Sequence, residues 1–222
     1  MVTTPHVRVA VLASGRGSNL AALLDARARC ELPVEFVLVG SDKASAAALR
    51  LAEAVGIPTL ALDPRSYPDR RAFDLDLFAR IAASGAELLV LAGFMRILDG
   101  EALRPWVGRI INIHPSLLPK YRGLHTHRRA LEAGDAEHGV SVHFVTAELD
   151  GGPVIAQARL PIEAGDDEAC LAQRLLPLEH QLLPAVLGLL ASGRLQWDGQ
   201  SPRFDGQPLR APLLLREGGL QP

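Results

Sequence analysis

The sequence predicts an α/β protein with three layers, in which a mostly parallel, twisted sheet carries helices on both faces and the N-terminal half is Rossmann-like. Three observations indicate this class. Short, nearly continuous apolar runs recur along the first half, segments with apolar residues at helical spacing separate them, and glycines mark the turns between. Strands this apolar need cover on both faces, which is typical of a parallel sheet built from alternating strands and helices.

The first strand is expected over residues 7–13, VRVAVLA, and it stops at a Ser-Gly pair. Leu20, Leu23 and Leu24 follow at helical spacing, so this segment predicts a strand, a glycine turn and a helix. The same alternation continues through a strand over 34–40, a helix over 46–55, a strand over 59–62, a helix over 70–83 and a strand over 88–92.

The second half changes style after a short helical piece at 101–106, a strand at 109–114 and a helix at 126–134. Residues 140–146 alternate and residues 154–162 are extended, with Asp-Gly-Gly between them, which favours an antiparallel or bent addition to the sheet. Residues 166–192 predict one long helix or two, with Pro177 and Pro184 as kinks or starts. We therefore expect one domain over 1–222, divided near residue 105 into two halves of one core (1–105 and 106–193), with a peripheral tail of hairpin turns (194–222).

Composition and charge indicate which classes of partner the protein can have. The 23 basic and 25 acidic residues give a formal charge of −2, and the arginines are scattered rather than clustered. A nucleic-acid partner is not expected without a basic patch. No apolar run approaches the roughly 18 residues of a membrane span, and no signal peptide precedes the first strand, so we expect a cytoplasmic protein without a membrane partner. Cys30 and Cys170 lack metal-ligand spacing and are expected to be free, structural thiols in a reducing compartment.

The glycine turn Gly15-Arg16-Gly17-Ser18-Asn19 lies between the first strand and the first helix. Backbone N–H groups at such a helix start can hold a phosphate. A dinucleotide is not favoured, because Leu20 stands where a third glycine is needed and no acidic residue closes the second strand. The alternative is a tight turn that needs glycine, with Ser18 capping the helix.

Asn112 and His114 end a buried strand, and two prolines then prevent the strand from continuing. The amide can donate to an oxygen that becomes negative, and the imidazole can move protons near neutral pH, which together suit acyl transfer. Asp150, beside two glycines, is a candidate to orient the imidazole. Each residue alone has an ordinary structural alternative as a turn or cap. No nucleophile elbow is present, so we expect direct attack by one substrate on the other.

The other histidines are weaker candidates. His125 and His127 form an HxH pair with His138 further along, but no acidic ligand pattern accompanies them, so no metal is expected. His143 alternates with Val142 and Phe144 on a strand and can face the site.

Several segments resemble the phosphoribosylglycinamide formyltransferases, a family of folate-dependent enzymes. They are VLASGRGSNL, VLAGFMRIL, INIHPSLLPKY, GLHTHRRALEAGDAEHGVSVHFVTAELDGGPVI and the Glu179-His180 pair, and they span nearly the whole core. The resemblance implies transfer of a formyl group from 10-formyltetrahydrofolate to the amine of 5-phosphoribosylglycinamide in purine synthesis. It implies two small-molecule substrates, no metal, and a monomer or homodimer. It also implies that residues 1–105 are a mononucleotide-binding half and residues 106–193 a catalytic and folate half.

The resemblance also assigns residues. It implies that Asn112, His114 and Asp150 are catalytic, and that Gly17, Ser18, Asn19 and Glu179 bind the ribonucleotide. The folate residues that it implies are Arg70, Met95, Arg96, Ile97, Leu98, Asn112, Val145 and Thr146. Arg16 and Arg122 depart from the family pattern, at loop positions beside the phosphate and catalytic turns.

Two other functions stay open. A formyltetrahydrofolate hydrolase would use water in place of the amine; such relatives carry a further domain before the first strand, so we expect the transferase. A non-catalytic phosphate- or nucleotide-binding module would fit the glycine turn but would leave Asn112, His114 and Asp150 unexplained.

Overall fold

Strand β1 (Val7–Leu12) lies inside a parallel sheet in this computed structural model, which describes residues 6–222. The strand order in this part of the chain is β4-β1-β2-β3. β1 pairs in parallel with both β2 and β4, and β2 pairs in parallel with β3. The bounds of the other three strands are Val34–Ser41 for β2, Thr59–Ala61 for β3 and Leu88–Leu91 for β4. The apolar runs of β1, β2 and β4 are thus largely buried strands, as predicted, whereas β3 at the edge of the sheet is half-buried to exposed.

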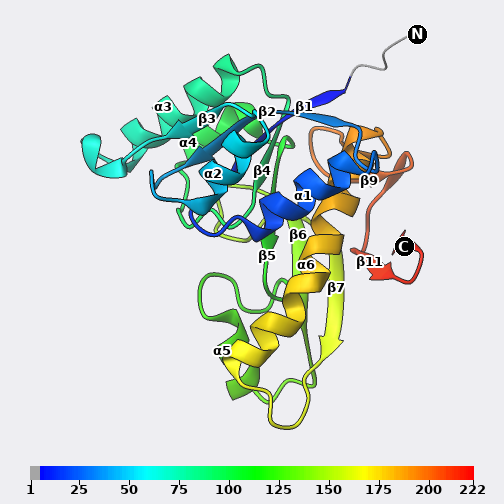
Figure 1. The fold of residues 1–222 in the computed structure, drawn as a ribbon. Coiled ribbons are helices and arrows are strands. Elements are labelled where there is room, and N and C mark those ends of the chain that lie inside the picture. Colours follow the sequence, from blue (N-terminus) through cyan, green and yellow to red (C-terminus); the bar gives the residue numbers. More distant parts are fainter. Residues whose placement is uncertain (1–5) are drawn as a thin grey trace. The chain divides into compact units, whose positions relative to one another are not determined.

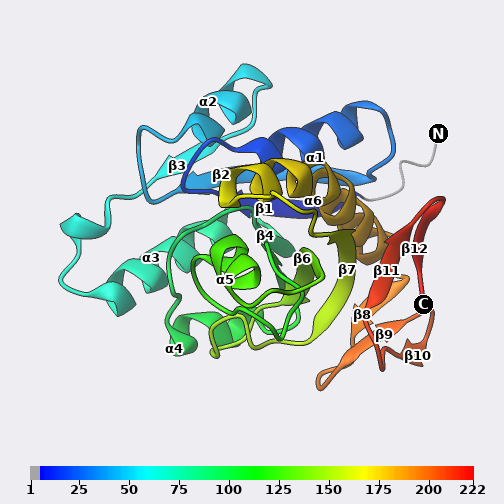
Figure 2. The ribbon, with the colours of Figure 1, turned by 90° about the horizontal axis from the view of Figure 1, so that it is seen from below.

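Helices cover both faces of this sheet, and Figure 2 shows α1 and α2 on one side of β1 and β2 with α3 and α4 on the other. Helix α3 begins after Asp69, whose carboxylate accepts a hydrogen bond from Ala72 N–H at 2.8 Å, and its extent matches the predicted helix. The bounds are Ser18–Ala28 for α1, Ala47–Ala54 for α2, Arg70–Ala83 for α3 and Gly100–Leu103 for α4, with 3-10 turns at Pro64–Ser66 and Arg104–Trp106.

The second part of the sheet begins with β5 (Ile110–His114) and β6 (Glu137–Phe144), which are neighbours. β6 pairs antiparallel with β7 (Val154–Pro161), and this decides between the two predicted arrangements. The chain folds into two compact units, Met1–Ile111 and Asn112–Pro222, so the division falls within β5 rather than near residue 105. A single functional domain over 1–222 stays a prediction.

Helix α6 (Glu168–Ala191) is one continuous helix, with Pro177 and Pro184 inside it. Figure 1 shows it in gold along β6 and β7. Its apolar face continues past both prolines, with Leu171, Leu182 and Leu187 fully buried, and this packing holds the helix together although each interior proline removes a backbone hydrogen bond. The shorter helix α5 (Thr126–Glu132) packs against α6.

The C-terminal tail differs from the expected peripheral appendage. Its last two strands, β11 (Leu213–Arg216) and β12 (Gly219–Gln221), extend the main sheet, because β11 pairs in parallel with β7 and β12 pairs antiparallel with β11. Only β8 (Leu195–Trp197), β9 (Pro202–Phe204) and β10 (Gln207–Pro208) form the separate hairpin sheet that the turns predicted.

Both cysteines are free and exposed, so neither Cys30 nor Cys170 belongs to the core. Within residues 6–222, no helix is long and apolar enough to cross a bilayer.

Candidate active site

Asn112 and His114 lie two residues apart near the end of β5, so their side chains leave the strand on the same face. The intervening Ile113 is buried, and Ile110 and Ile111 anchor the strand in the core. His114 is itself buried, with 6% of its surface exposed. The alternation of the strand thus presents an amide and an imidazole together.

The catalytic turn, residues 115–121, leads the chain away from β5 and back to the His114 ring. Tyr121 adopts a positive φ of 57° at its end, and its carbonyl accepts a hydrogen bond from His114 Nε2 at 2.9 Å. Because a carbonyl can only accept, the proton of the neutral ring lies on Nε2 and the lone pair lies on Nδ1.

Asp150 reaches the same place from the loop between β6 and β7. Its φ of 47° is a left-handed conformation that Asp tolerates better than most residues. Oδ2 accepts the Gly123 N–H at 2.9 Å and lies 3.5 Å from His114 Nδ1. Oδ1 lies 3.5 Å from Asn112 Nδ2. The three residues predicted to be catalytic therefore form one cluster.

His143 completes this cluster from β6 and is 2% exposed. Its Nδ1–H donates to the Phe144 carbonyl at 2.8 Å, so its Nε2 accepts from Asn112 Nδ2 at 3.1 Å. Nε2 also lies 3.7 Å from Asp150 Oδ1. The sequence offered only the strand alternation as a signal for His143, which was too weak to rank it with the other three.

The charges of the cluster follow from burial and close neighbours. Burial lowers the pKa of His114 most strongly, the Tyr121 carbonyl and the Asp150 carboxylate raise it, and His143 also lowers it; the net effect is a lowered pKa. For Asp150, burial pushes the pKa upward, but His143, His114 and the Gly123 N–H together lower it below its ordinary value. Near neutral pH the site therefore holds a carboxylate beside a neutral ring. The Asp150 carboxylate acts to raise the pKa of His114, but burial outweighs that effect.

Comparison with known proteins shows which family the chain belongs to. The sequence profile described as formyl transferase matches residues 7–187. This chain belongs to the formyl transferase family. The phosphoribosylglycinamide formyltransferase of Escherichia coli K12 is 47% identical over 203 residues, which cover 91% of this chain and 96% of that protein.

Other relatives of this formyltransferase agree. The trifunctional purine biosynthetic protein adenosine-3 of Drosophila pseudoobscura is 48% identical over 88% of this chain, which spans 14% of that longer protein. The solved structure of phosphoribosylglycinamide formyltransferase from Coxiella burnetii has a TM-score of 0.87 at 45% identity and covers 92% of this chain and 96% of that one. The predicted family and the α/β fold class are confirmed.

The glycine turn of this formyltransferase has the shape that the sequence predicted. Gly17 has a φ of 78°, and a Cβ there would lie 2.9 Å from Ala48 Cα, so only glycine fits. Gly17 is the N-cap of α1 and Ser18 is the first helical residue, so the alternative in which the Ser18 side chain caps the helix is wrong. Asn19 is buried in the first turn of the same helix.

Two folate candidates of the first unit, Arg96 and Arg70, act electrostatically on Asp74 of α3. Burial raises the pKa of Asp74 most strongly; the Asp99 N–H, which Oδ2 accepts at 2.7 Å, and then Arg96 and Arg70 lower it, and the net effect is a raised pKa. Arg96 stacks on the Phe73 ring at 4.6 Å. The neighbours of Arg96 in this segment, Met95 and Ile97, are 69% and 51% exposed, whereas Leu98 is buried.

The remaining candidates lie in the second unit. Val145 and Thr146 follow β6 and are half-buried, and Thr146 Oγ1 donates to the Glu148 carbonyl at 3.4 Å. Arg122, which departs from the family pattern, pairs with Glu148. Glu179 is half-buried on α6.

Of the three histidines for which a metal was considered, His127 and His138 contact each other. His127 Nδ1 and His138 Nε2 are 3.0 Å apart, so one donates to the other. Burial, and to a smaller extent the neighbouring His127, lowers the pKa of His138 to about 4. Among residues 6–222, no group of three or more His, Cys, Asp or Glu has a geometry that could hold a metal ion.

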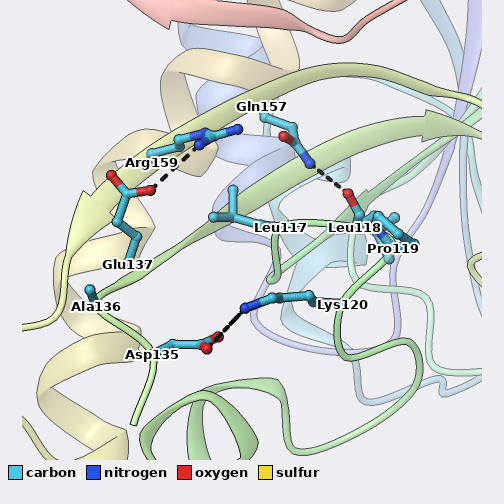
Figure 3. Close-up of a pocket in the computed structure, with 9 residues that line it drawn as sticks. All are labelled: Leu117, Leu118, Pro119, Lys120, Asp135, Ala136, Glu137, Gln157 and Arg159. Carbon is cyan, nitrogen blue, oxygen red and sulfur yellow. Dashed lines mark hydrogen bonds and ion pairs between the residues drawn. The ribbon is translucent and has the colours of Figure 1, made fainter. Parts of the chain in front are cut away.

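A pocket of about 420 Å³ lies against the catalytic turn, and Figure 3 shows its lining. Two ion pairs border it, Lys120 with Asp135 and Arg159 with Glu137. Gln157 reaches from β7 to the Leu118 carbonyl of the turn. Asn112, His114 and Asp150 do not line this pocket, so it is separate from the candidate site.

Proposed function

We propose that this formyltransferase transfers the formyl group of 10-formyltetrahydrofolate to the amine of 5-phosphoribosylglycinamide in purine biosynthesis. The observation that carries the proposal is the buried cluster of Asn112, His114 and Asp150 in a chain of this family. Relatives that match over most of the chain are named for this substrate, as the Escherichia coli protein is.

The reaction needs no covalent enzyme intermediate. The amine nitrogen of the ribonucleotide attacks the formyl carbon, and the C=O electron pair moves onto oxygen. The oxyanion then collapses to a carbonyl, the bond from carbon to N10 of the folate breaks, and the amine proton is transferred to that nitrogen. The enzyme must stabilise the oxyanion and carry the proton.

Asn112 is the donor for the oxyanion. One Nδ2 hydrogen is held by His143 Nε2 at 3.1 Å, whereas the second faces Asp150 over a longer 3.5 Å. This second hydrogen is free to turn toward a substrate oxygen, because the bond it gives up is weak. Removing one such donor typically lowers kcat about 10²–10³-fold.

His114 carries the proton between the amine and the folate nitrogen, directly or through water. In the protonated ring, Nε2–H donates to the Tyr121 carbonyl and Nδ1–H faces Asp150 at 3.5 Å, so Nδ1, which has the longer contact, is the nitrogen that takes up and releases the moving proton. General acid-base help of this kind is typically worth about 10²–10⁴-fold. Holding both substrates together adds a proximity contribution.

The substrate sites are those that the resemblance implies. The ribonucleotide phosphate binds the turn at Gly17, Ser18 and Asn19, where backbone N–H groups and the start of α1 favour an anion. Glu179 binds its ribose hydroxyls. The folate binds the eight residues that the resemblance assigns to it. Among them, exposed Met95 and Ile97 offer apolar surface to its ring.

Release of tetrahydrofolate tests the proposal. The purified protein is incubated with 10-formyltetrahydrofolate, with and without 5-phosphoribosylglycinamide, and the released tetrahydrofolate and formylated ribonucleotide are measured. We expect release only with the ribonucleotide, in equal amounts. Release that ignores the ribonucleotide would identify a hydrolase, and the absence of any release would favour a binding module.

A further inference from the structure

Two side chains that take no part in the chemistry above, one from β6 and one from β7, hold the catalytic turn in shape. Ser141 of β6 and Gln157 of β7 lie directly opposite each other in the antiparallel pair. Ser141 is fully buried and Gln157 is 4% exposed. A buried amide and a buried hydroxyl need hydrogen-bond partners, and both find them in the turn.

The Ser141 hydroxyl uses all of its hydrogen-bonding capacity here. It donates to the Ser116 carbonyl at 2.7 Å and accepts from Leu118 N–H at 3.0 Å and from Gln157 Nε2 at 3.0 Å. A hydroxyl has one donor and two acceptor lone pairs, so this group is saturated. Gln157 Nε2 also donates to the Leu118 carbonyl at 2.9 Å. Two side chains thus bind three backbone groups of the turn.

The position of the catalytic turn determines the tautomer of His114. The turn starts next to His114 and ends at Tyr121, whose carbonyl accepts the His114 Nε2 proton. Within the turn, the Ser116 hydroxyl donates to the Lys120 carbonyl at 2.6 Å, which joins the network to the residue before Tyr121. A shift at Leu118 is therefore transmitted to the carbonyl that selects the tautomer of His114.

We propose that Gln157 is a positioning residue for His114, acting through Ser141 and the catalytic turn. The inference rests on the proposed role of His114. Gln157 touches no substrate; it places the Tyr121 carbonyl, and so keeps the Nε2 proton and the ring plane where the transfer needs them. Displacement of a catalytic group by about 1 Å can lower a rate about 10²-fold.

Gln157→Met is the main test, because Met has a similar length and no N–H. Arg159→Met is the matched control: Arg159 lies two residues along β7, lines the same pocket, and makes only an exposed pair with Glu137. Ser141→Ala removes the other half of the network and serves if the first variant does not fold. Folded protein is quantified for each variant by its melting curve and near-UV spectrum.

We expect Gln157→Met and Ser141→Ala to lower kcat per folded molecule about 10- to 10²-fold, with both KM values changed less than about threefold. The ¹⁵N shifts of the His114 ring should move away from the Nε2–H tautomer in both variants, whereas Arg159→Met should match the wild type. The ring shifts do not depend on the reaction.

Normal kcat with unmoved ring shifts would overturn the proposal, as would an equal loss in Arg159→Met. His114→Asn, measured in parallel, separates the two levels of inference. If that variant keeps full turnover, the proposed role of His114 fails; if it is inactive while Gln157→Met is normal, only the positioning role fails.

Discussion

Replacing Asp150 by asparagine separates its structural role in the loop from its proposed role as a charge beside His114. Asparagine tolerates the φ of 47° and can accept the Gly123 N–H, but it carries no charge. The distance from Asp150 Oδ2 to His114 Nδ1 is 3.5 Å. At an effective dielectric constant of about 20, a protonated ring at this distance is attracted by about 5 kcal/mol. If the transition state holds that ring, this attraction limits the loss of kcat to about 10³–10⁴-fold.

The pH behaviour gives a second readout. The carboxylate raises the pKa of His114 against the effect of burial, so its removal should lower the pKa of His114 further. Stability should change little, with a shift in Tm of no more than about 3 °C for a chain of this size. The assay combines kcat between pH 5 and 9, NMR titration of His114 and a melting curve for each protein.

Asp205→Asn is the matched control, because Asp205 has the same φ of 47° and pairs with Arg194 in the tail. This variant should keep wild-type kcat. The reasoning about Asp150 is refuted if Asp150→Asn turns over within about threefold of the wild type and the His114 titration does not move. A loss of kcat that only follows unfolding would leave Asp150 as a turn residue.

Three further outcomes are expected. Ser18→Asp places a negative charge at the start of α1, which should leave the stability of the fold unchanged or raise it by up to about 1 kcal/mol. The same charge should raise the KM for the ribonucleotide about tenfold or more in steady-state kinetics. An unchanged KM would contradict a phosphate site at this turn. Asp74→Asn keeps an acceptor for Asp99 N–H but removes the charge facing Arg96, so the KM for the folate should rise about tenfold with the ribonucleotide KM unaffected. His138 has a pKa of about 4 in the folded protein against 6.5 unfolded, so the neutral ring stabilises the fold above pH 6.5, and on the order of 3 kcal/mol is lost as the pH falls toward 4; urea unfolding at pH 7.5 and 5 should show most of this loss in the wild type and little in His138→Gln.

Much of the fold followed from local patterns. The run at residues 7–13, the helix at 70–83 and the strand ending at His114 all lie where apolar periodicity predicted them. Such segments are determined by which face each residue buries, which a sequence displays directly. Asn112 and His114 were found for the same reason, since two residues apart on a strand means one face.

Non-local pairing was harder to predict. β11 pairs with β7 although more than 50 residues separate them along the chain, and the segment around Leu213 carries no alternation that distinguishes a sheet strand from a surface hairpin. The prolines of α6 were misleading for a related reason. Packing of the helix against β6 and β7 decides that it stays continuous, and local propensity does not include that packing.

The candidate site, too, could be predicted from local sequence only in part. Its side chains could be proposed from residue type and spacing, but the carbonyl of Tyr121 is a backbone group that any residue could supply, and no sequence pattern marks it. The partners of His143 come from β5 and from the loop after β6, so their convergence depends on the register of the strands. The network of Ser141 and Gln157 was missed for the same reason.

The two buried histidines of the cluster differ in their hydrogen bonds, and the difference supports the proposed role of His114. His143 donates from Nδ1 to a carbonyl and accepts at Nε2 from Asn112, so its neutral ring is fully satisfied. His114 donates from Nε2 to a carbonyl, but its Nδ1 lone pair faces the Asp150 carboxylate, which can only accept. Only the protonated form of His114 satisfies both neighbours, while burial keeps that form unfavourable in the free site. In the proposed mechanism an oxyanion forms beside Asn112 and adds negative charge nearby, so we expect proton uptake by His114 to become favourable as the amine attacks, when general base catalysis requires it.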